Sequence, residues 1–324
     1  MLKRMLHFQG IPDDRVVLGP RLGEDAAVID IGDRYLVAKT DPITFVSEEI
    51  GWYLVQVNAN DLATTGAAPR WLLVTLLLPE ACTTADHAER IFRQIDDACR
   101  ELHIAVVGGH TEVTCGLDRP LAVGCMLGEV DKGSWVATGG SCVGDDILLA
   151  KGIAIEGTSI IAREKGPELL GRGYSAGSIA RARAYLYDPG ISVVHEALLA
   201  AGLSTVHAMH DPTEGGLATG LHELAEAAGV GAWVDAEAIS VLPECASLCA
   251  EFGLDPLGTL ASGALLITLP PEQTPALRSV YATEGIPCAV IGRITPAAEG
   301  LKIQRGAVLA DLPRFDQDEI IRLF

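Results

Sequence analysis

Basic side chains and long apolar runs are both scarce in this chain of 324 residues. It carries 24 Lys and Arg against 43 Asp and Glu, which gives a formal net charge of −19. Such a chain repels phosphate backbones and anionic lipids, which argues against general nucleic-acid or membrane-surface binding. The apolar run at residues 71–78 has the length of a strand and is far shorter than the roughly 20 residues of a membrane span. The first residues turn polar too soon for a secretory signal, so we expect a soluble, cytoplasmic protein.

Aromatic residues are also few, with 6 Phe, 6 Tyr and 4 Trp, whereas there are 35 Gly. Aliphatic cores joined by many tight turns are typical of a layered α/β protein. The 8 cysteines form no short disulfide framework. Cys245 and Cys249 lie one helical turn apart, but no second pair completes a tetrahedral zinc site.

Three common catalytic motifs are missing from the sequence. There is no Gly-x-x-x-x-Gly-Lys-Ser/Thr loop, no Gly-x-Gly-x-x-Gly before a helix and no His-Glu-x-x-His pair. The usual nucleotide-binding and hydrolase interpretations therefore lose most of their support.

Strands and helices alternate along both halves of the chain, which predicts an α/β or α+β protein. In the first half we expect strands at 35–40, 71–78, 104–107 and 121–127, and helices at 50–65 and from about 83 to 102. In the second half we expect strands at 146–151, 231–235, 264–269 and 288–292, and helices at 176–187, 191–201, 217–228, 243–253 and 272–283. The glycine- and serine-rich segment 132–144 predicts a boundary between domains 1–139 and 140–324.

Polar residues gather where the predicted elements of the first half end. They form four groups, Gly23-Glu24-Asp25, Thr40-Asp41, Asn58 with Asp61, and the Gly108–Glu112 loop that includes His110. Asn58 and Asp61 share one helix face, since they are three residues apart. Several carboxylates brought together need cations, and hard oxygen ligands suit Mg²⁺ with nucleotide phosphates. Each group alone also fits a solvated turn, a helix-surface amide or a loop histidine, although Asp61 on an apolar helix requires a partner.

The second half contains one unusual loop, His210-Asp-Pro-Thr-Glu-Gly-Gly, which leads into a helix. Thr213 is a plausible N-cap, and Gly215 and Gly216 would let a ligand approach the positive end of that helix. The alternative is a Pro/Gly turn with a capping threonine.

These segments, in this order, resemble the ATP-binding superfamily of aminoimidazole ribonucleotide synthetase, over roughly residues 19 to 292. The most specific match is Asn58-Ala-Asn-Asp-Leu-Ala-Thr-Thr-Gly-Ala-Ala-Pro, and Gly23-Glu-Asp-Ala-Ala and Gly108-Gly-His-Thr-Glu match two further motifs. The loop His210-Asp-Pro-Thr-Glu-Gly-Gly-Leu is similar to that of the hydrogenase-maturation carbamoyl dehydratase branch.

The resemblance implies two α/β domains with mixed sheets flanked by helices, and a homodimer whose first-domain sheets join into a barrel. ATP and Mg²⁺ would lie near that interface, in the N-terminal domain. By carry-over, the metal-binding residues are Glu24, Asp25, Asp41 and Asp61; the cofactor-binding residues are Gly23, Lys39, Thr40, Asn58, Gly108, Gly109, Thr111, Thr213, Gly215 and Gly216; and the catalytic residues are His110, Glu112, His210 and Asp211. His110 stands where the family has an acid, and a neutral imidazole does not replace a carboxylate as a Mg²⁺ ligand. Glu112, two residues further on, is the alternative ligand.

The function that this resemblance implies is ATP-dependent activation of a small-molecule oxygen by Mg²⁺-assisted phosphoryl transfer, in an enzyme related to the hydrogenase-maturation branch. Two alternatives stay open: a non-catalytic ATP-binding or assembly protein, and an enzyme similar to thiamine monophosphate kinase. The branch carries a terminal Cys on a flexible tail, whereas the last Cys here is Cys288. We expect residues 315–324 to form a short amphipathic helix, with Ile320, Ile321 and Phe324 packed down, that accepts no carbamoyl group.

Overall fold

The computed structural model describes residues 10–21, 26–44, 48–203 and 205–324 and divides the chain into two compact units, Met1–Trp135 and Val136–Phe324. The division falls inside the segment 132–144. Each unit is a mixed sheet flanked by helices, as the sequence predicts. No helix in the described parts of the chain is both long and apolar enough to cross a membrane.

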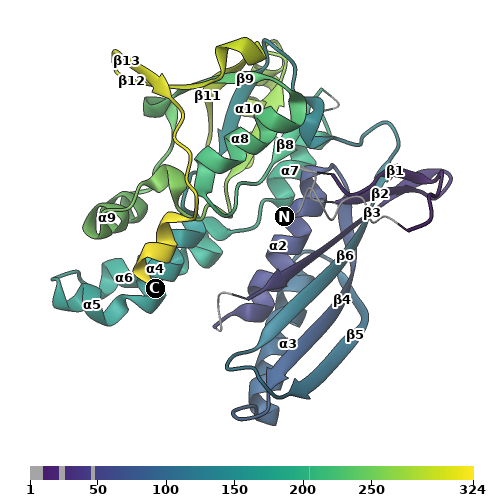
Figure 1. Ribbon diagram of the computed structural model, residues 1–324, viewed down its shortest axis with the longest axis vertical. Helices are drawn as coiled ribbons and strands as arrows, with labels where there is room; N and C mark the ends of the chain where they lie inside the picture. The colour runs from purple at the N-terminus through teal and green to yellow at the C-terminus, as the bar shows by residue number, and fades with distance from the viewer. Residues whose placement is uncertain (1–9, 22–25, 45–47, 204) are drawn as a thin grey trace. The chain divides into compact units, whose positions relative to one another are not determined.

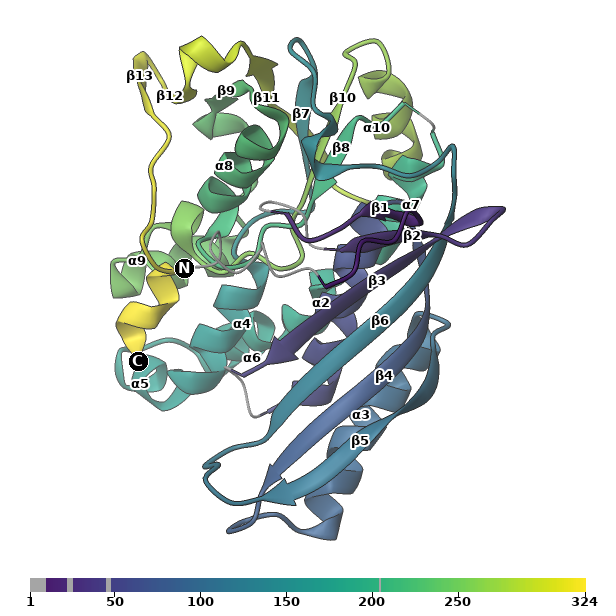
Figure 2. The ribbon, with the colours of Figure 1, turned by 45° about the vertical axis from the view of Figure 1, so that its right-hand side comes forward.

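The first unit is a six-stranded sheet with two helices on one face (Figures 1 and 2). Its elements are β1 (Val16–Leu18), β2 (Ala27–Asp30), β3 (Arg34–Ile43), α2 (Ile50–Thr64), β4 (Ala68–Pro79), α3 (Ala85–Glu101), β5 (Ala105–Thr114) and β6 (Leu121–Asp131). The strand order is β1-β2-β3-β6-β4-β5, and β4 and β5 form the parallel pair, joined through α3. The helices α2 and α3 therefore fall between strands, where the apolar periodicity predicts them.

Alternation along β4 shows which face of this sheet the helices cover. Leu72, Val74 and Leu76 are buried, whereas Leu73 and Thr75 between them are only half-buried. A strand buried on one face alternates in this way. The sequence predicts a fully buried strand here, but the face opposite the helices stays partly accessible, because no helix in the described part of this unit packs on it.

Two strand ends predicted in the first unit are wrong. The strand predicted to stop at Asp41-Pro42 continues to Ile43, because β3 pairs with β6 over its whole length, with Pro42 opposite Val123. β2 pairs with β3 no further than Ala38, so the missing N–H of Pro42 lies beyond the last residue that pairs with β2.

The predicted Gly108-Gly109 break is also wrong, because both glycines lie inside β5. The register with β4 shifts by one residue, since Leu72 pairs with Val106 and Leu73 with Gly108, which is a β-bulge. Gly109 has φ of 146°, and a Cβ there would overlap the carbonyl of Val74. The glycines thus mark a close approach of two strands.

The second unit is a seven-stranded sheet in the order β13-β12-β9-β11-β7-β10-β8, in which β12 and β9 are parallel. Its strands are β7 (Asp146–Ala150), β8 (Ala208–His210), β9 (Gly231–Asp235), β10 (Leu265–Leu269), β11 (Cys288–Thr295), β12 (Leu301–Arg305) and β13 (Val308–Asp311). Its helices are α4 (Ile155–Glu164), α5 (Gly166–Gly171), α6 (Ala176–Ala184), α7 (Val194–Ala201), α8 (Gly216–Ala228), α9 (Pro243–Phe252) and α10 (Thr274–Thr283), with short turns η1 (Thr138–Gly140), η2 (Leu186–Gly190), η3 (Ala236–Ala238), η4 (Pro256–Gly258), η5 (Ala297–Glu299) and η6 (Glu319–Leu323).

Helices cover both faces of this second sheet. Ile147 and Leu149 of β7 share a buried cluster with Leu217 and Leu221 of α8. On the other face Thr274 of α10 donates a hydrogen bond to Asp146 at 2.8 Å. Both faces are therefore covered, which explains why all five residues of β7 are buried.

The last residues pack against the second unit but do not form the predicted helix. Glu319–Leu323 is a short 3₁₀ turn, in which Ile320 is buried whereas Ile321 and Phe324 are 44% and 60% exposed. A 3₁₀ turn has three residues per turn, so residues four apart do not share a face as they would in an α-helix. Asp318 anchors the turn by accepting the backbone N–H of Gly215 at 2.7 Å.

Candidate functional site

Four of the predicted site residues meet between β3 and α2 of the first unit. Lys39 Nζ lies 3.0 Å from Asp61 Oδ2 and 3.9 Å from Asp41 Oδ2. Asn58 Nδ2 donates to the backbone oxygens of Leu54 at 2.9 Å and Asp41 at 3.4 Å. We call Lys39, Asp41, Asn58 and Asp61 the carboxylate cluster.

The carboxylate cluster is largely withdrawn from water. The side chains of Lys39 and Asp61 are 13% and 7% exposed, while that of Asp41 is 37% exposed. Two carboxylates this close require positive charge, and removing one partner of a buried ion pair is costly, typically about 3 to 5 kcal/mol. The Lys39 ammonium supplies that charge here.

A glycine on β6 lets α2 bring its polar face to the sheet. A Cβ on Gly124 would lie 2.6 Å from Asn58 Nδ2, so any larger residue would displace the amide. Asn58 is fully buried, and its Oδ1 has no hydrogen-bond partner among the described residues. An unused buried amide oxygen and two carboxylates, on α2 and the neighbouring β3, are oxygen donors of the kind that a hard cation such as Mg²⁺ binds.

The remaining predicted residues of the first unit lie apart from this cluster or outside the described residues. Gly23, Glu24 and Asp25 fall outside the described residues. Thr40, next to Asp41, lies on the opposite face of β3, where its hydroxyl donates to the Gly124 carbonyl at 2.8 Å.

The segment Gly108–Glu112 lies on β5, at the far edge of the sheet from β3. Asp41, Gly124, Val74 and Gly109 form one row across β3, β6, β4 and β5. Three strand spacings of about 4.8 Å separate Asp41 from Gly109 by roughly 14 Å. Within this unit the structure does not bring Gly108, Gly109, His110, Thr111 or Glu112 to the carboxylate cluster.

His110 and Glu112 form an exposed pair. His110 Nε2 lies 3.6 Å from Glu112 Oε2, with side chains 69% and 53% exposed. His110 pairs in register with Thr75, which places it on the helix-free face of the sheet.

In the second unit the predicted loop has a backbone built around two glycines. His210 ends β8 and its Nε2 lies 2.9 Å from Glu223 Oε2 of α8, while Asp211 is buried.

The predicted N-cap, Thr213, is wrong, because Gly215 occupies the N-cap position of α8 with φ of 76° and no side chain caps the helix. The Thr213 carbonyl instead accepts the N–H groups of Gly216 and Ala261 at 3.1 and 3.2 Å. A Cβ on Gly216 would lie 2.5 Å from the Leu257 carbonyl.

Two buried acids, Glu156 and Asp318, lie near this loop, and neither belongs to a motif of the sequence. Glu156 of α4 is buried, and burial raises its pKa to about 8, helped by the nearby charges of Glu214 and Asp318 and opposed by a hydrogen bond with Ser262. Burial also raises the pKa of Asp318, although the N–H groups of Ile320 and Gly215 oppose the shift. Glu156 lies in the segment 152–166, for which the apolar periodicity predicts no helix. No local pattern therefore indicates that this acid is buried.

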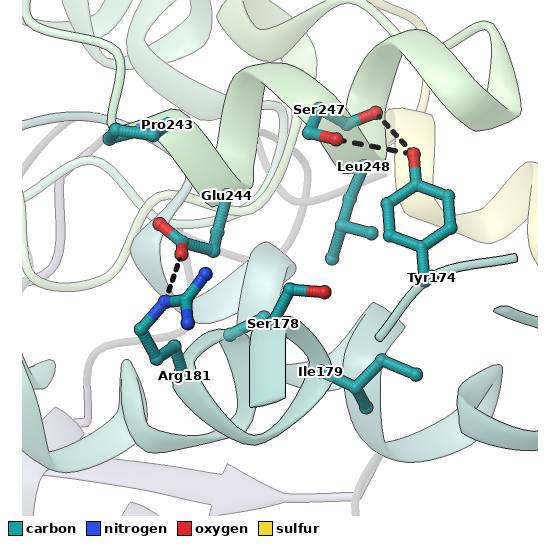
Figure 3. A pocket seen from close by; sticks show the side chains of 9 residues that line it. Tyr174, Ser178, Ile179, Arg181, Pro243, Glu244, Ser247 and Leu248 are labelled. Atoms are coloured by element: carbon teal, nitrogen blue, oxygen red, sulfur yellow. Dashed lines mark hydrogen bonds and ion pairs between the residues drawn. The ribbon is translucent and has the colours of Figure 1, made fainter. Parts of the chain in front are cut away.

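A pocket of about 280 Å³ lies elsewhere in the second unit, between α6 and α9 (Figure 3). Arg181 pairs with Glu244 at 2.7 Å across it, and the Tyr174 hydroxyl lies 3.2 Å from that of Ser247. It contains none of the predicted site residues, and these polar groups already pair with one another.

Comparison with known proteins identifies both halves of the chain. The sequence model of the AIR synthase related protein N-terminal domain matches residues 23–130, and that of the C-terminal domain matches residues 143–303. The chain is 30% identical to the hydrogenase expression/formation protein HupE of Azotobacter chroococcum over 86% of this chain and 80% of that protein. It is 29% identical to the carbamoyl dehydratase HypE of Rhizobium leguminosarum over 85% of this chain and 77% of that protein.

A solved structure of the hydrogenase maturation protein HypE in complex with ATP has the same fold. Its TM-score against this chain is 0.76, with 26% identity over 94% of this chain and 92% of that one. The two-domain α/β fold predicted from the sequence is thereby confirmed.

Replacing Glu156 by Gln should change how stability depends on pH. The native carboxyl, with pKa about 8, holds its proton to a higher pH than the unfolded one, at 4.5. The native state therefore binds more protons between these values, and stability falls as pH rises through that window, by on the order of 4 kcal/mol. Urea unfolding from pH 5 to pH 8 should show a shallower fall for Glu156→Gln than for the parent.

The matched control is Glu164→Gln, an exposed acid on the same helix. It should follow the parent curve. Parallel curves for the parent and Glu156→Gln would show that the carboxyl is ionised in the native state at neutral pH.

Proposed function

Because the chain belongs to the AIR synthase related protein family, through both its N-terminal and its C-terminal domain, we propose that it is an ATP-dependent enzyme of hydrogenase-maturation type. In this proposal it transfers the γ-phosphoryl group of ATP to an oxygen atom of a small acyl or amide substrate, and ADP leaves. Phosphoryl transfer depends mainly on positioning and on neutralising charge, so the protein must bring a cation and the phosphates together.

The observation that carries this proposal is the carboxylate cluster. Asp41 and Asp61 supply two anionic oxygens, and the unused Oδ1 of Asn58 supplies a neutral one, which is a donor set for Mg²⁺. Glu24 and Asp25 are proposed to complete it. Lys39 neutralises the two carboxylates in this structure. Once the cation is bound, its ammonium would be released towards a phosphate, which the backbone of Gly23 is also proposed to bind.

The second-unit loop is a proposed ligand-binding segment. Thr213, Gly215 and Gly216 are proposed to bind the cofactor at the start of α8. In this structure the N–H of Gly215 donates to Asp318 at 2.7 Å and that of Gly216 to the Thr213 carbonyl at 3.1 Å, so a ligand there would replace these bonds. His210 and Asp211, both buried at the end of β8, are proposed as the groups that orient the reacting oxygen.

We propose that the chain forms a homodimer through the helix-free face of the first sheet. Half-buried Trp71, Leu73 and Leu77 of β4 lie on that face, beside the exposed edge strand β5 with Val106, Val107 and Val113 at its surface. A second copy would cover this apolar face and edge. It would also offer a place for Gly108, Gly109, Thr111 and the His110–Glu112 pair in a shared site. A cytoplasmic location is part of the same proposal.

The reaction itself is tested by ADP release. The purified chain with Mg²⁺ and ATP should release ADP faster in the presence of one member of a panel of small carbamoyl compounds, amides, amines and ribonucleotides. Tight ATP binding with no stimulated release by any of them would favour the second candidate, a non-catalytic ATP-binding or assembly protein. Release stimulated by thiamine monophosphate would instead favour the kinase.

Asp61→Asn should weaken Mg-ATP binding at least tenfold, or about 1.4 kcal/mol. The amide keeps the shape of the carboxylate but removes the charge that holds the cation and Lys39. Calorimetry on the folded variant measures this, with the exposed Asp97→Asn on α3 as the matched control. Unchanged Mg-ATP affinity in folded Asp61→Asn would remove Asp61 from the site.

Leu73→Asp should convert the proposed dimer into a monomer. A carboxylate in the middle of the apolar face cannot be buried against a second copy without a large desolvation cost. Light scattering after size exclusion gives the mass, and Val308→Asp, at an exposed position on β13, should leave it unchanged. A parent protein that is already monomeric at micromolar concentration would exclude this interface.

A further inference from the structure

Three side chains with metal-binding atoms meet in the second unit, at a place that none of the predicted site residues occupies. Cys142 lies in the turn after η1, Asp145 immediately precedes β7, and His207 immediately precedes β8. The thiol sulfur, a carboxylate oxygen and an imidazole nitrogen of these residues all lie within 4.8 Å of one another. Within the described ranges of the chain, they form the one such group of three His, Cys, Asp or Glu side chains. We call them the Cys-Asp-His cluster.

The backbone around the Cys-Asp-His cluster is fixed by contacts between distant segments. The N–H of His207 donates to the Thr268 carbonyl at 2.9 Å, and the Ser141 and Thr268 hydroxyls lie 2.9 Å apart. On the other side, the N–H of Gly144 donates to the Ile294 carbonyl and the N–H of Ile294 to that of Asp145, both at 2.9 Å. The two chain segments that carry the three side chains are therefore held together before any ligand binds.

Glycine at position 140 allows the closest of these approaches. A Cβ there would overlap the carbonyl of His207, so no larger side chain fits between the two segments. Sequence composition alone marks residues 132–144 as a linker. The structure shows that their glycine-rich end packs tightly against the segment before β8.

The exposure of the three side chains of the Cys-Asp-His cluster increases from Asp145 through His207 to Cys142. The Asp145 carboxylate is 5% exposed and the His207 imidazole 34%, while Cys142 is exposed. Asp145 Oδ2 lies 2.8 Å from His207 Nδ1 and accepts the N–H of Cys142, also at 2.8 Å. A buried carboxylate thus orients the imidazole and the turn, and the thiol side remains open to an incoming ion.

We propose that Cys142, Asp145 and His207 bind one divalent transition-metal ion of the zinc class. Thiolate, imidazole and carboxylate together suit Zn²⁺, whereas Mg²⁺ prefers an all-oxygen set such as the carboxylate cluster of the first unit. Two ligand atoms about 2.0 to 2.3 Å from a tetrahedral ion lie roughly 3.3 to 3.6 Å apart. Shifts of about 1 Å or less bring the three atoms to that spacing, and water fills the fourth position on the exposed side.

Binding of a divalent ion at the Cys-Asp-His cluster releases one proton to solvent and involves no redox step. The Cys142 thiol loses its proton to solvent as the sulfur–metal bond forms. The His207 imidazole stays neutral, because its proton moves from Nδ1 to Nε2 when Nδ1 binds the ion. The ion then takes the place of the proton that His207 and Asp145 share.

Cobalt(II) is the probe, because its spectrum reports a thiolate ligand and the coordination number of the ion. The full-length chain is reduced with a phosphine, stripped with a chelator and titrated with Co²⁺. One equivalent should produce a near-ultraviolet thiolate-to-cobalt charge-transfer band with the visible bands of four-coordinate cobalt, and Zn²⁺ should abolish them. Cys142→Ser should lose the charge-transfer band, and His207→Gln should weaken Co²⁺ binding at least tenfold.

Matched controls separate this site from other cysteines and from the nucleotide site. Cys115→Ser and His195→Gln change an exposed thiol in the first unit and an exposed imidazole in the second, and both should keep the parent spectrum. Asp61→Asn should keep it as well, because the carboxylate cluster is a different site. A parent protein without the charge-transfer band, or a folded Cys142→Ser that retains it, would overturn the proposal; Cys142→Ala serves if the serine variant does not fold.

Discussion

The close approach of α2 to β6 is the constraint on which the candidate nucleotide site depends. Gly124 lies under Asn58 and Gly128 under Leu62, where a Cβ would come within 2.6 Å of Asn58 Nδ2 and 2.8 Å of Leu62 Cδ2. Without these glycines the helix would have to move away from the sheet. Asp61, on the same face as Asn58, would then lose Lys39. A packing requirement thus places two polar side chains of α2 opposite β3, the strand that carries Lys39 and Asp41.

The close packing of α2 on the sheet has an electrostatic cost, which the positive charge of Lys39 offsets. Placing Asp61 on a helix with buried neighbours desolvates a carboxylate, and the ammonium 3.0 Å away compensates it. In the second unit a buried acid is compensated differently, because burial and the nearby charges of Glu214 and Asp318 raise the pKa of Glu156 to about 8 and so favour its protonated form. In the first unit the Asp61 carboxylate is paired with an ammonium that a metal cation could replace. In the second unit the raised pKa of Glu156 favours the neutral carboxyl, which does not attract a cation.

Much of the fold could be predicted because its signals are local. The apolar spacing of 50–65 predicts α2 to within one residue, and that of 71–78 predicts β4, which begins three residues earlier, at Ala68, and ends at Pro79. The errors have non-local causes. Gly108-Gly109 indicates a turn by local chemistry, but strand pairing with β4 keeps both residues in β5. Thr213 is a good N-cap by residue type, yet the approach of η4 to Gly216 leaves that position to Gly215.

The same distinction explains which cation sites the sequence reveals. Asn58 and Asp61 are visible because one helix carries both. The only closely spaced cysteines, Cys245 and Cys249, are buried in α9, each a core residue of that helix. The thiol with imidazole and carboxylate neighbours is Cys142, whose partner His207 comes from a distant segment. No pattern along the chain links them, since the contact is made by the pairing of β7, β10 and β8. The proposed soft ligand set therefore lies in the second unit and the proposed hard set in the first, and their different donor atoms would let one chain distinguish a transition metal from Mg²⁺.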